Sequence, residues 1–546
     1  MMDGVSRRRV LGMGLASGAG LMMAGTLPAA EPAGSEPTVA VETAGGRVRG
    51  LRAEGVSRFL GIPYGDDTGQ HRFQPPRAAP PWTGVRDCFY AGAQTMQGTV
   101  NLASAGGSNP MAGAQTPAGQ VVLAVVRATT VTDPQSEDCL FLNVFTPEAS
   151  RSTKRPVMVW LHGGGWTMGQ GLNSMTDGAA LARSGDLVVV SMNHRLNALG
   201  YLYLGDFHPD FADSGNCGQL DIILALQWVR DNIGAFGGDP GNVTIFGQSG
   251  GGMKVSALLG TLPARGLFHK AIAQSGATPR LVDRADAIAI AEQTLATLGV
   301  ARADVHALQT LDVHKVIAAA AAAKVAGMNP IATLAPVVDG RAVPAHPFDP
   351  VATAISRDVP LMIGTARDEN TMFLAFDPAF GKLTEEDVRK RFEALLGPRA
   401  EAALQVYRGL APSDPPTYWL TSLLTDQTFR IPALIEADRK AAQHAAPVFM
   451  YRVDYQPRVA DRMLRSPHGT EIPLMFGNLV PTGFIGTDPD LHPLAERTMQ
   501  QWIHFARSGN PSVSGLTWPR YETARRLTMI IDAPGRVASD PDRMTR

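Results

Sequence analysis

The 546-residue sequence lacks any large excess of charge of one sign, because 49 lysines and arginines stand against 50 aspartates and glutamates. Such a balance creates no strong field that would attract nucleic acid or an anionic membrane surface, so we expect neither as a partner. Beyond residue 33 the sequence also lacks an apolar run of the roughly 18 residues that a membrane-spanning helix needs. We therefore expect no stable membrane insertion of the mature chain, and a small molecule as its substrate.

Cysteine is scarce. The three cysteines, Cys88, Cys139 and Cys217, are odd in number and lack the spacing of a metal site, so we expect no metal. One disulfide between Cys88 and Cys139, in an oxidising compartment, and three buried free thiols are both compatible with this pattern. No functional role is assigned to any of the three.

Residues 1–33 differ in composition from the rest. Arg7, Arg8 and Arg9 precede an uncharged stretch, residues 10–30, that is rich in glycine, alanine, leucine and methionine. This pattern is typical of a bacterial twin-arginine signal, and its glycine content disfavours a retained membrane anchor. We predict a signal peptide over residues 1–33, export by the twin-arginine (Tat) machinery, and a periplasmic or secreted protein.

The remaining sequence has ordinary globular composition, and apolar runs of strand length alternate in it with helical patterns. The runs are 156–161, 187–192, 243–246, 270–273, 360–364 and 448–453. This alternation is what a parallel sheet with crossover helices requires. It predicts a large, mostly parallel, twisted central sheet with helices on both faces.

Around this sheet the sequence predicts smaller elements. Short β-prone runs over residues 38–51 predict a small N-terminal antiparallel sheet, and residues 282–324 and 385–408 are helical in pattern. The stretch 97–135 has little apolar periodicity and is interpreted as a surface loop or lid. We predict one domain over residues 38–532 and a C-terminal tail over residues 533–546.

The first motif that carries chemistry is Gly-Gln-Ser-Gly-Gly at residues 247–251, which follows the predicted strand 243–246 and precedes a helical segment. A serine on such a sharp strand-to-helix turn has an exposed hydroxyl, and small neighbours allow the strained backbone. The motif is short and also occurs by chance, so its context is what favours Ser249 as a nucleophile.

A second motif, His-Gly-Gly-Gly-Trp at residues 162–166, follows the predicted strand 156–161. Consecutive glycines let main-chain amides approach a substrate, which is what an oxyanion hole needs. We predict the amides of Gly164, Gly165 and Gly250 as its donors. His162 is interpreted as a structural residue that shapes the loop.

A serine nucleophile needs a histidine base and a carboxylate to orient that base, and both should follow it in the chain. Asp368 and Glu369 lie in the loop after strand 360–364, and the sequence alone leaves both open as the acid. The histidines beyond them are His444, His468, His492 and His504. We predict His468 as the base, because it stands in a loop before an apolar segment.

Together these motifs resemble the type-B carboxylesterase family, which includes bacterial para-nitrobenzyl esterases and cholinesterases. The similarity runs through nearly the whole mature chain. It also includes Phe-Leu-Gly-Ile-Pro-Tyr at 59–64, Arg-Phe at 72–73, Ser-Glu-Asp-Cys-Leu at 136–140, Leu-Asn-Val at 142–144 and Ala-Phe-Gly-Gly-Asp-Pro at 235–240. The resemblance implies the α/β-hydrolase fold and a serine carboxylesterase that needs no cofactor.

The resemblance also implies roles for single residues. Glu369, not Asp368, aligns with the family's catalytic acid, and Arg72 with Glu137 matches a structural ion pair. Cys139 matches a disulfide position whose usual partner is missing near residues 94–97. The sequence departs from the family at the elbow, where Gly-Gln-Ser-Gly-Gly replaces Gly-Glu-Ser-Ala-Gly, and at Asn370, which replaces a glycine.

We therefore expect hydrolysis of carboxylic esters through an acyl-enzyme on Ser249, with His468 as base, Glu369 as the acid and no metal or organic cofactor. Lactones, thioesters or amides are alternative substrates for the same residues, because one fold supports many reactions. A non-catalytic binding protein on this scaffold is a further alternative. The sequence indicates neither the natural ester nor an oligomeric state.

Overall fold

The computed structural model describes residues 34–98, 114–129, 133–326, 328, 333–479, 485–486 and 488–543. The predicted signal peptide, residues 1–33, lies outside these ranges. None of the helices in the described ranges has the length and apolar character of a membrane span.

A twelve-stranded sheet forms the centre of the described chain. In spatial order its strands are β1 (Glu36–Pro37), β4 (Leu51–Ala53), β5 (Val56–Pro63), β9 (Phe141–Thr146), β11 (Val188–Met192), β10 (Arg155–Leu161), β12 (Gly238–Gln248), β13 (Lys270–Gln274), β14 (Leu361–Ala366), β15 (Val448–Val453), β16 (Leu527–Ile531) and β17 (Arg536–Ser539). The strands from β11 to β16 are parallel, while β1, β4, β5 and β9 form an antiparallel edge and β17 pairs antiparallel with β16. Each predicted apolar run corresponds to one of these strands, so the large mostly parallel sheet is confirmed.

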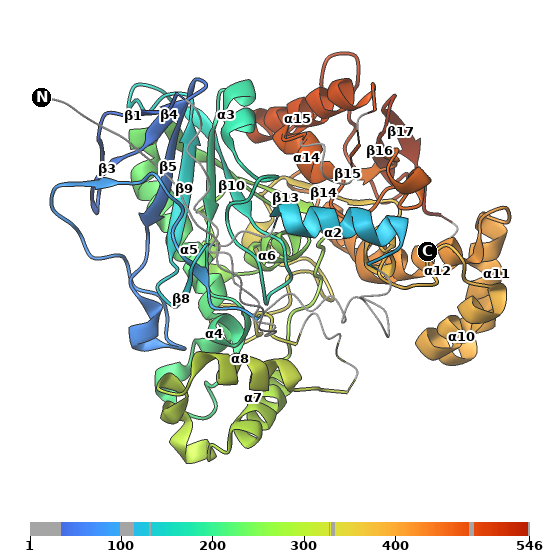
Figure 1. Cartoon of the computed structure of the whole chain (residues 1–546), viewed down its shortest axis with the longest axis horizontal. Coiled ribbons are helices and arrows are strands. Elements are labelled where there is room, and N and C mark those ends of the chain that lie inside the picture. The colour runs from blue at the N-terminus through green and yellow to red at the C-terminus, as the bar shows by residue number, and fades with distance from the viewer. Residues whose placement is uncertain are drawn as a thin grey trace, which may run out of the picture.

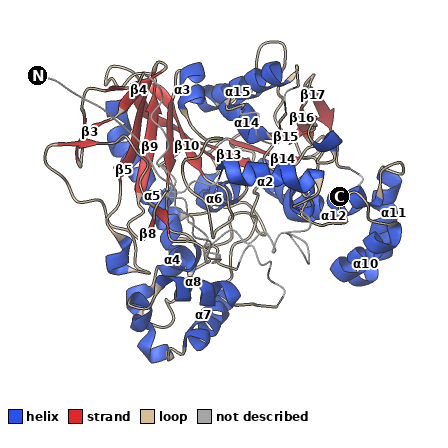
Figure 2. Ribbon diagram, in the orientation of Figure 1, coloured by secondary structure: helices blue, strands red, loops and turns tan. Residues whose placement is uncertain are grey.

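Helices cover the sheet and extend beyond it (Figures 1 and 2). They are α2 (Pro117–Thr129), α3 (Ala179–Gly185), α4 (Asn197–Tyr201), α5 (Cys217–Asn232), α6 (Gly250–Leu259), α7 (Arg284–Leu298), α8 (Val313–Ala322), α9 (Thr371–Leu374), α10 (Glu385–Leu396), α11 (Ala400–Leu410), α12 (Pro416–Thr425), α13 (Ile431–Ala441), α14 (Glu471–Phe476) and α15 (Leu491–Ser508). In Figure 1, α7 and α8 lie at the bottom and α10 and α11 at the right, away from the strands. These four are the helical decorations expected from residues 282–324 and 385–408.

The parallel strands are apolar on both faces because each face packs against helices. In β10, Val157 and Val159 belong to a core shared with α5 and α13, whereas Met158 and Trp160 belong to a second core shared with α3 and α15. Successive side chains of a strand point to opposite faces, so an uninterrupted apolar run supplies both cores.

A second, small sheet lies near the N-terminus of the described chain. Strands β2 (Val41–Thr43) and β3 (Gly46–Arg49) pair antiparallel, as the sequence predicts, and β6 (Val85–Asp87) adds to β3 in parallel. A two-stranded pair, β7 (Gln94–Thr95) with β8 (Gln135–Ser136), completes the strands.

Two segments differ from the sequence-based expectation. The stretch 97–135, expected as a loop or lid, contains the helix α2, whose apolar residues pack beside α9 to α12. The expected tail, residues 533–546, contains strand β17, and its Asp542 forms ion pairs with Arg430 and Arg452. The packed domain therefore continues past residue 532, because a polar strand after Pro534 and Gly535 pairs with the sheet edge.

Candidate active site

Ser249 lies on a sharp turn between β12 and α6. Its backbone has φ 58° and ψ −124°, a conformation that non-glycine residues rarely adopt, and its amide donates to the carbonyl of Gln274 at 2.8 Å. A Cβ on Gly247 or Gly251 would collide with the backbone that crosses the turn, at Leu161 for both residues. The two outer glycines of the motif are therefore required by close backbone approach.

The glycine loop after β10 is held by hydrogen bonds to its carbonyls. Nδ1 of His162 donates to the carbonyl of Gly163 at 2.8 Å, and the Met168 amide donates to the carbonyl of Gly164 at 3.1 Å. Because the peptide unit is planar and trans, the N–H groups of Gly164 and Gly165 point away from these contacts. Gly164 and Gly165 have φ of 91° and 63°, which favour glycine.

This loop packs directly against the elbow. A Cβ on Gly250 would collide with the backbone of Gly165, and a Cβ on Gly163 would be in van der Waals contact with Cβ of Ser249. In the described part of the chain, the amides of Gly164, Gly165 and Gly250 donate to no protein acceptor. The predicted oxyanion donors thus lie together, beside Ser249, at the start of a helix whose first amides favour negative charge.

Glu369 and His468 are brought into contact from loops that follow β14 and β15. Nδ1 of His468 donates to Oε2 of Glu369 at 2.5 Å, and Oε1 of Glu369 accepts from the Ala366 amide at 2.6 Å. Glu369 is fully buried and His468 nearly so. The carboxylate fixes the neutral imidazole as the tautomer that carries its proton on Nδ1 and leaves Nε2 as an acceptor.

The neighbouring Asp368 faces elsewhere. Its carboxylate accepts from Nε of Arg367 at 2.8 Å and from the Ser466 amide at 3.4 Å. Burial raises the pKa of Asp368, although Arg367 and Arg465 oppose that shift. Of the two carboxylates that the sequence leaves open, Glu369 is therefore the one in contact with the histidine.

The imidazole of His468 is enclosed by two aromatic rings. The ring centres of Phe373 and Phe429 lie 5.2 Å and 4.8 Å from it. Phe429 is on a π-helical turn, Asp426–Arg430, inserted between α12 and α13, and such insertions occur frequently at functional sites. The two rings restrict the imidazole without competing for its nitrogens.

The third predicted residue, Ser249, forms no hydrogen bond with His468, which instead contacts the preceding residue, Gln248. Nε2 of His468 lies 3.2 Å from Nε2 of Gln248, so the amide of Gln248 donates to the lone pair that a serine proton would need. Sequence reasoning treated Gln248 only as a departure from a family motif. The signal in the sequence is that Gln248 directly precedes the predicted nucleophile, Ser249.

A second buried carboxyl, Glu471, lies near this pair. Its Oε1 accepts from Oγ of Ser275 at 3.3 Å, and Oε2 has no hydrogen-bond partner in the described ranges. Burial, followed by the charge of Glu369, raises the pKa of Glu471 to about 7. Sequence reasoning did not single out this residue, although it follows His468 by only three positions.

An ion pair and three buried thiols belong to the scaffold around the site. Nη2 of Arg72 and Oε1 of Glu137 lie 2.5 Å apart, which confirms the expected ion pair. Cys88, Cys139 and Cys217 are free and buried, so the disulfide alternative does not occur here. Burial raises the pKa of each thiol to about 12.

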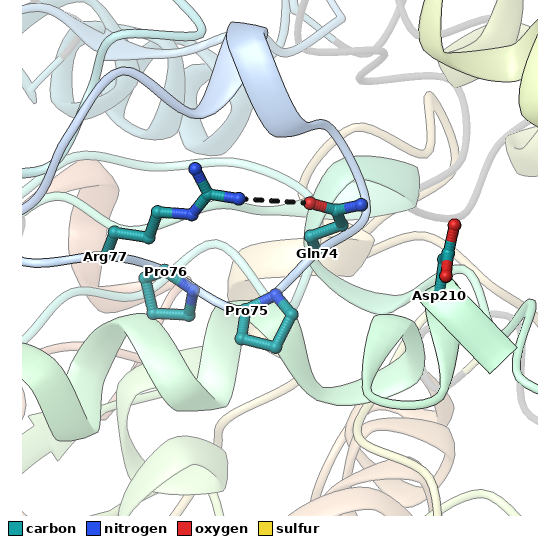
Figure 3. Close-up of a pocket in the computed structure, with 5 residues that line it drawn as sticks. All are labelled: Gln74, Pro75, Pro76, Arg77 and Asp210. Atoms are coloured by element: carbon teal, nitrogen blue, oxygen red, sulfur yellow. Dashed lines mark hydrogen bonds between the residues drawn. The ribbon is translucent and has the colours of Figure 1, made fainter.

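A cavity of about 370 Å³ lies at another place, lined by Gln74, Pro75, Pro76, Arg77 and Asp210 (Figure 3). None of these residues belongs to the predicted catalytic set. Asp210 also belongs, with His208 and His306, to a group of possible metal ligands whose atoms lie within 4.8 Å of one another. This group is largely exposed, and its contact at 3.1 Å is a hydrogen bond between Nε2 of His306 and the carboxylate of Asp210.

Comparison with known proteins gives consistent matches over the whole described chain. Residues 35–545 match the model of the carboxylesterase family. The chain is 35% identical to a para-nitrobenzyl esterase of Bacillus subtilis (strain 168), over 92% of this chain and 96% of that protein. It is 33% identical to a phenmedipham hydrolase of Pseudarthrobacter oxydans, over 91% and 96%.

Solved structures match in the same way. A carboxylesterase of Geobacillus stearothermophilus at pH 6.2 superimposes with a TM-score of 0.78 at 34% identity, covering 93% of this chain and 99% of that one. A structure described as PNB esterase superimposes with a TM-score of 0.74 at 33% identity, covering 93% and 98%.

Proposed function

Because this chain belongs to the carboxylesterase family and is a carboxylic ester hydrolase of the α/β-hydrolase fold, we propose that its reaction is carried by Ser249, His468 and Glu369. The observation that carries this assignment is the buried 2.5 Å contact between His468 Nδ1 and Glu369 Oε2; the same histidine also contacts Gln248, the residue before the elbow serine. The free amides of Gly164, Gly165 and Gly250 supply the donors for an oxyanion.

In the first half of the reaction, His468 exchanges its contact with Gln248 for the hydroxyl of Ser249. Oγ attacks the ester carbonyl carbon while its proton passes to Nε2 of His468. The carbonyl oxygen becomes negatively charged and accepts hydrogen bonds from the three amides. Each amide stabilises the transition state by on the order of 3 kcal/mol. Glu369 stabilises the imidazolium that forms.

The tetrahedral intermediate then collapses. The C–O bond to the alcohol breaks, and the alkoxide takes the proton from Nε2 as it leaves, so an ester of Ser249 remains. Water repeats the sequence: His468 takes its proton, the hydroxide adds to the acyl carbon, and Ser249 leaves with that proton. The acid is released and the free enzyme is restored.

The nucleophile is tested with Ser249→Ala and 4-nitrophenyl acetate. Loss of the attacking oxygen should lower kcat by roughly 10⁵-fold, as for serine enzymes in general. Ser256→Ala is a matched control, because Ser256 is a buried serine of α6, the helix that follows Ser249, and its hydroxyl donates to Glu436 at 3.0 Å. The assignment fails if Ser249→Ala keeps more than about a tenth of the wild-type rate.

We also propose that residues 1–33 are a twin-arginine signal and that the mature enzyme is periplasmic or secreted. The support is the sequence pattern of Arg7, Arg8 and Arg9 before an uncharged, glycine-rich stretch. Replacing Arg7 and Arg8 together by lysine should leave the uncleaved chain in the cytoplasm of a bacterial host. Export is measured by cell fractionation and immunoblotting. Unchanged export of that variant would exclude the twin-arginine route.

A further inference from the structure

Lys254 is a buried cation on α6, five residues after Ser249. Its Nζ donates to the carbonyl of His162 at 3.0 Å and to the carbonyl of Gly165 at 2.9 Å. It also lies 5.8 Å from the centre of the Trp166 ring. In the part of the chain that the structure describes, no carboxylate forms an ion pair with this ammonium group.

A buried charge without a counterion is costly, because the ammonium loses its hydration. Burial lowers the pKa of Lys254 to about 7, which expresses that cost. A methionine would fill a similar volume without the cost of burying a charge. Ionisable groups kept in such surroundings cluster at functional sites, so the position of Lys254 behind the glycine loop calls for a functional explanation.

Lys254 binds the carbonyls of His162 and Gly165. Along the chain, these two carbonyls lie on either side of the amides of Gly164 and Gly165, the proposed oxyanion donors. The carbonyls between them are bound by Nδ1 of His162 and by the Met168 amide. All four carbonyls of residues 162–165 therefore have a donor on the side away from the proposed oxyanion. Without Lys254, the carbonyls of His162 and Gly165 would lose this donor.

Lys254 also contributes to the ionisation of the side chains around it. His162 and His194 are stacked at 4.8 Å, and burial followed by the charge of Lys254 lowers the pKa of both, that of His162 to about 3. Both imidazoles are therefore neutral at pH 7. When Lys254 is protonated, it therefore supplies the positive charge behind the loop.

We propose that Lys254 is a positioning residue of the oxyanion hole, which holds Gly164 and Gly165 with their amides toward Ser249 and favours the anionic intermediate through its charge. This inference rests on the proposed function of those amides. It adds to the three catalytic side chains a residue that acts through the backbone and touches no substrate.

The test compares Lys254→Met with Lys440→Met. Lys440 is a second buried lysine, on α13, whose Nζ donates to the carbonyls of Ser356 at 2.5 Å and Arg357 at 3.0 Å, and burial lowers its pKa to about 8. Both substitutions remove a buried ammonium from two backbone carbonyls, but Lys440 binds no residue of the glycine loop. Lys440→Met therefore measures the purely structural effect of such a loss.

The measurements are kcat and KM for 4-nitrophenyl acetate, thermal unfolding, and inhibition by a trifluoromethyl ketone, which forms a tetrahedral oxyanion on serine. For Lys254→Met we expect kcat to fall about 100-fold, as when an oxyanion donor is lost, with KM within about threefold of wild type. Affinity for the ketone should fall by a similar factor. Lys440→Met should keep kcat and ketone affinity within about threefold, whatever its melting temperature.

A folded Lys254→Met enzyme with kcat and ketone affinity within about threefold of wild type would overturn the proposal. If Lys254→Met does not fold, Lys254→Gln, which is shorter and neutral, decides by the same criterion. If neither folds while Lys440→Met does, Lys254 belongs to the scaffold and the proposal is also overturned. A wild-type chain that neither hydrolyses the ester nor reacts with a fluorophosphonate would instead overturn the proposed function.

Discussion

Replacing Glu369 by glutamine separates the charge of the acid from its shape. In the wild type, Oε1 accepts from the Ala366 amide at 2.6 Å and Oε2 accepts from Nδ1 of His468 at 2.5 Å. The oxygen of a glutamine must face the Ala366 amide, because two N–H groups cannot hydrogen-bond each other. Its NH₂ group then faces Nδ1 of His468.

That orientation forces the wrong tautomer of the histidine. Nδ1 becomes the acceptor, the proton moves to Nε2, and Nε2 can no longer receive the proton of Ser249. A matching exchange in a serine protease lowers kcat by about 10⁴-fold, and we expect a loss of that order here. KM should change little, because no contact with the substrate is removed.

The assay is turnover of 4-nitrophenyl acetate, with active sites counted by a fluorophosphonate. Asp368→Asn is the matched control, because Asp368 is the adjacent buried carboxylate but binds Arg367 and Ser466. It should keep kcat within about tenfold of wild type. A Glu369→Gln enzyme with more than about a tenth of wild-type kcat, or an equal loss in both variants, would refute the reasoning.

Three other predictions concern buried polar groups. Gln248→Glu places a carboxylate beside Nε2 of His468 and favours the imidazolium. The acid limb of the pH profile of kcat/KM should therefore move to higher pH by about one unit. An acid limb at the wild-type pH would contradict this prediction. Burial raises the pKa of Glu436 to about 8, so the folded state binds its proton more tightly than the unfolded state. The contribution of Glu436 to the free energy of unfolding therefore falls as the pH rises from about 4.5 to 8. Glu436→Gln should therefore raise the melting temperature by about 1–3 °C at pH 8 but not at pH 4.5, and the opposite pattern would contradict the assignment. The three buried thiols should react with Ellman's reagent only after unfolding, and reaction in the native enzyme would show that a cysteine is accessible.

The sheet could be predicted from the sequence because its physical signal is local. Each parallel strand is buried on both faces, so β10 contains the uninterrupted apolar run 156–161, and β15 is apolar except at Arg452. The elements that were missed have weaker signals. Helix α2 lies in a stretch rich in small and polar residues, and β17 is a polar edge strand with little burial.

The site could be predicted in part. Ser249 and the glycines are found because the strained elbow and the loop restrict which residues fit. The residue pattern alone leaves Glu369 and Asp368 equivalent; the family resemblance implies Glu369, and the fold shows that Glu369 is the one in contact with His468. The roles of Gln248 and Lys254 depend on contacts with segments 220 and 92 positions away. No local pattern reports such contacts, although a lysine on an otherwise buried helix is a signal that sequence reasoning could use.

The central claim is that the hydroxyl of Ser249, the imidazole of His468 and the three backbone amides act on one carbonyl group. A crystal structure of the enzyme after reaction with a fluorophosphonate tests it most directly. We expect phosphorus bonded to Oγ of Ser249, a phosphonyl oxygen within about 3.1 Å of the amides of Gly164, Gly165 and Gly250, and His468 turned from Gln248 toward the adduct. An adduct on another residue, or a phosphonyl oxygen remote from those amides, would contradict it.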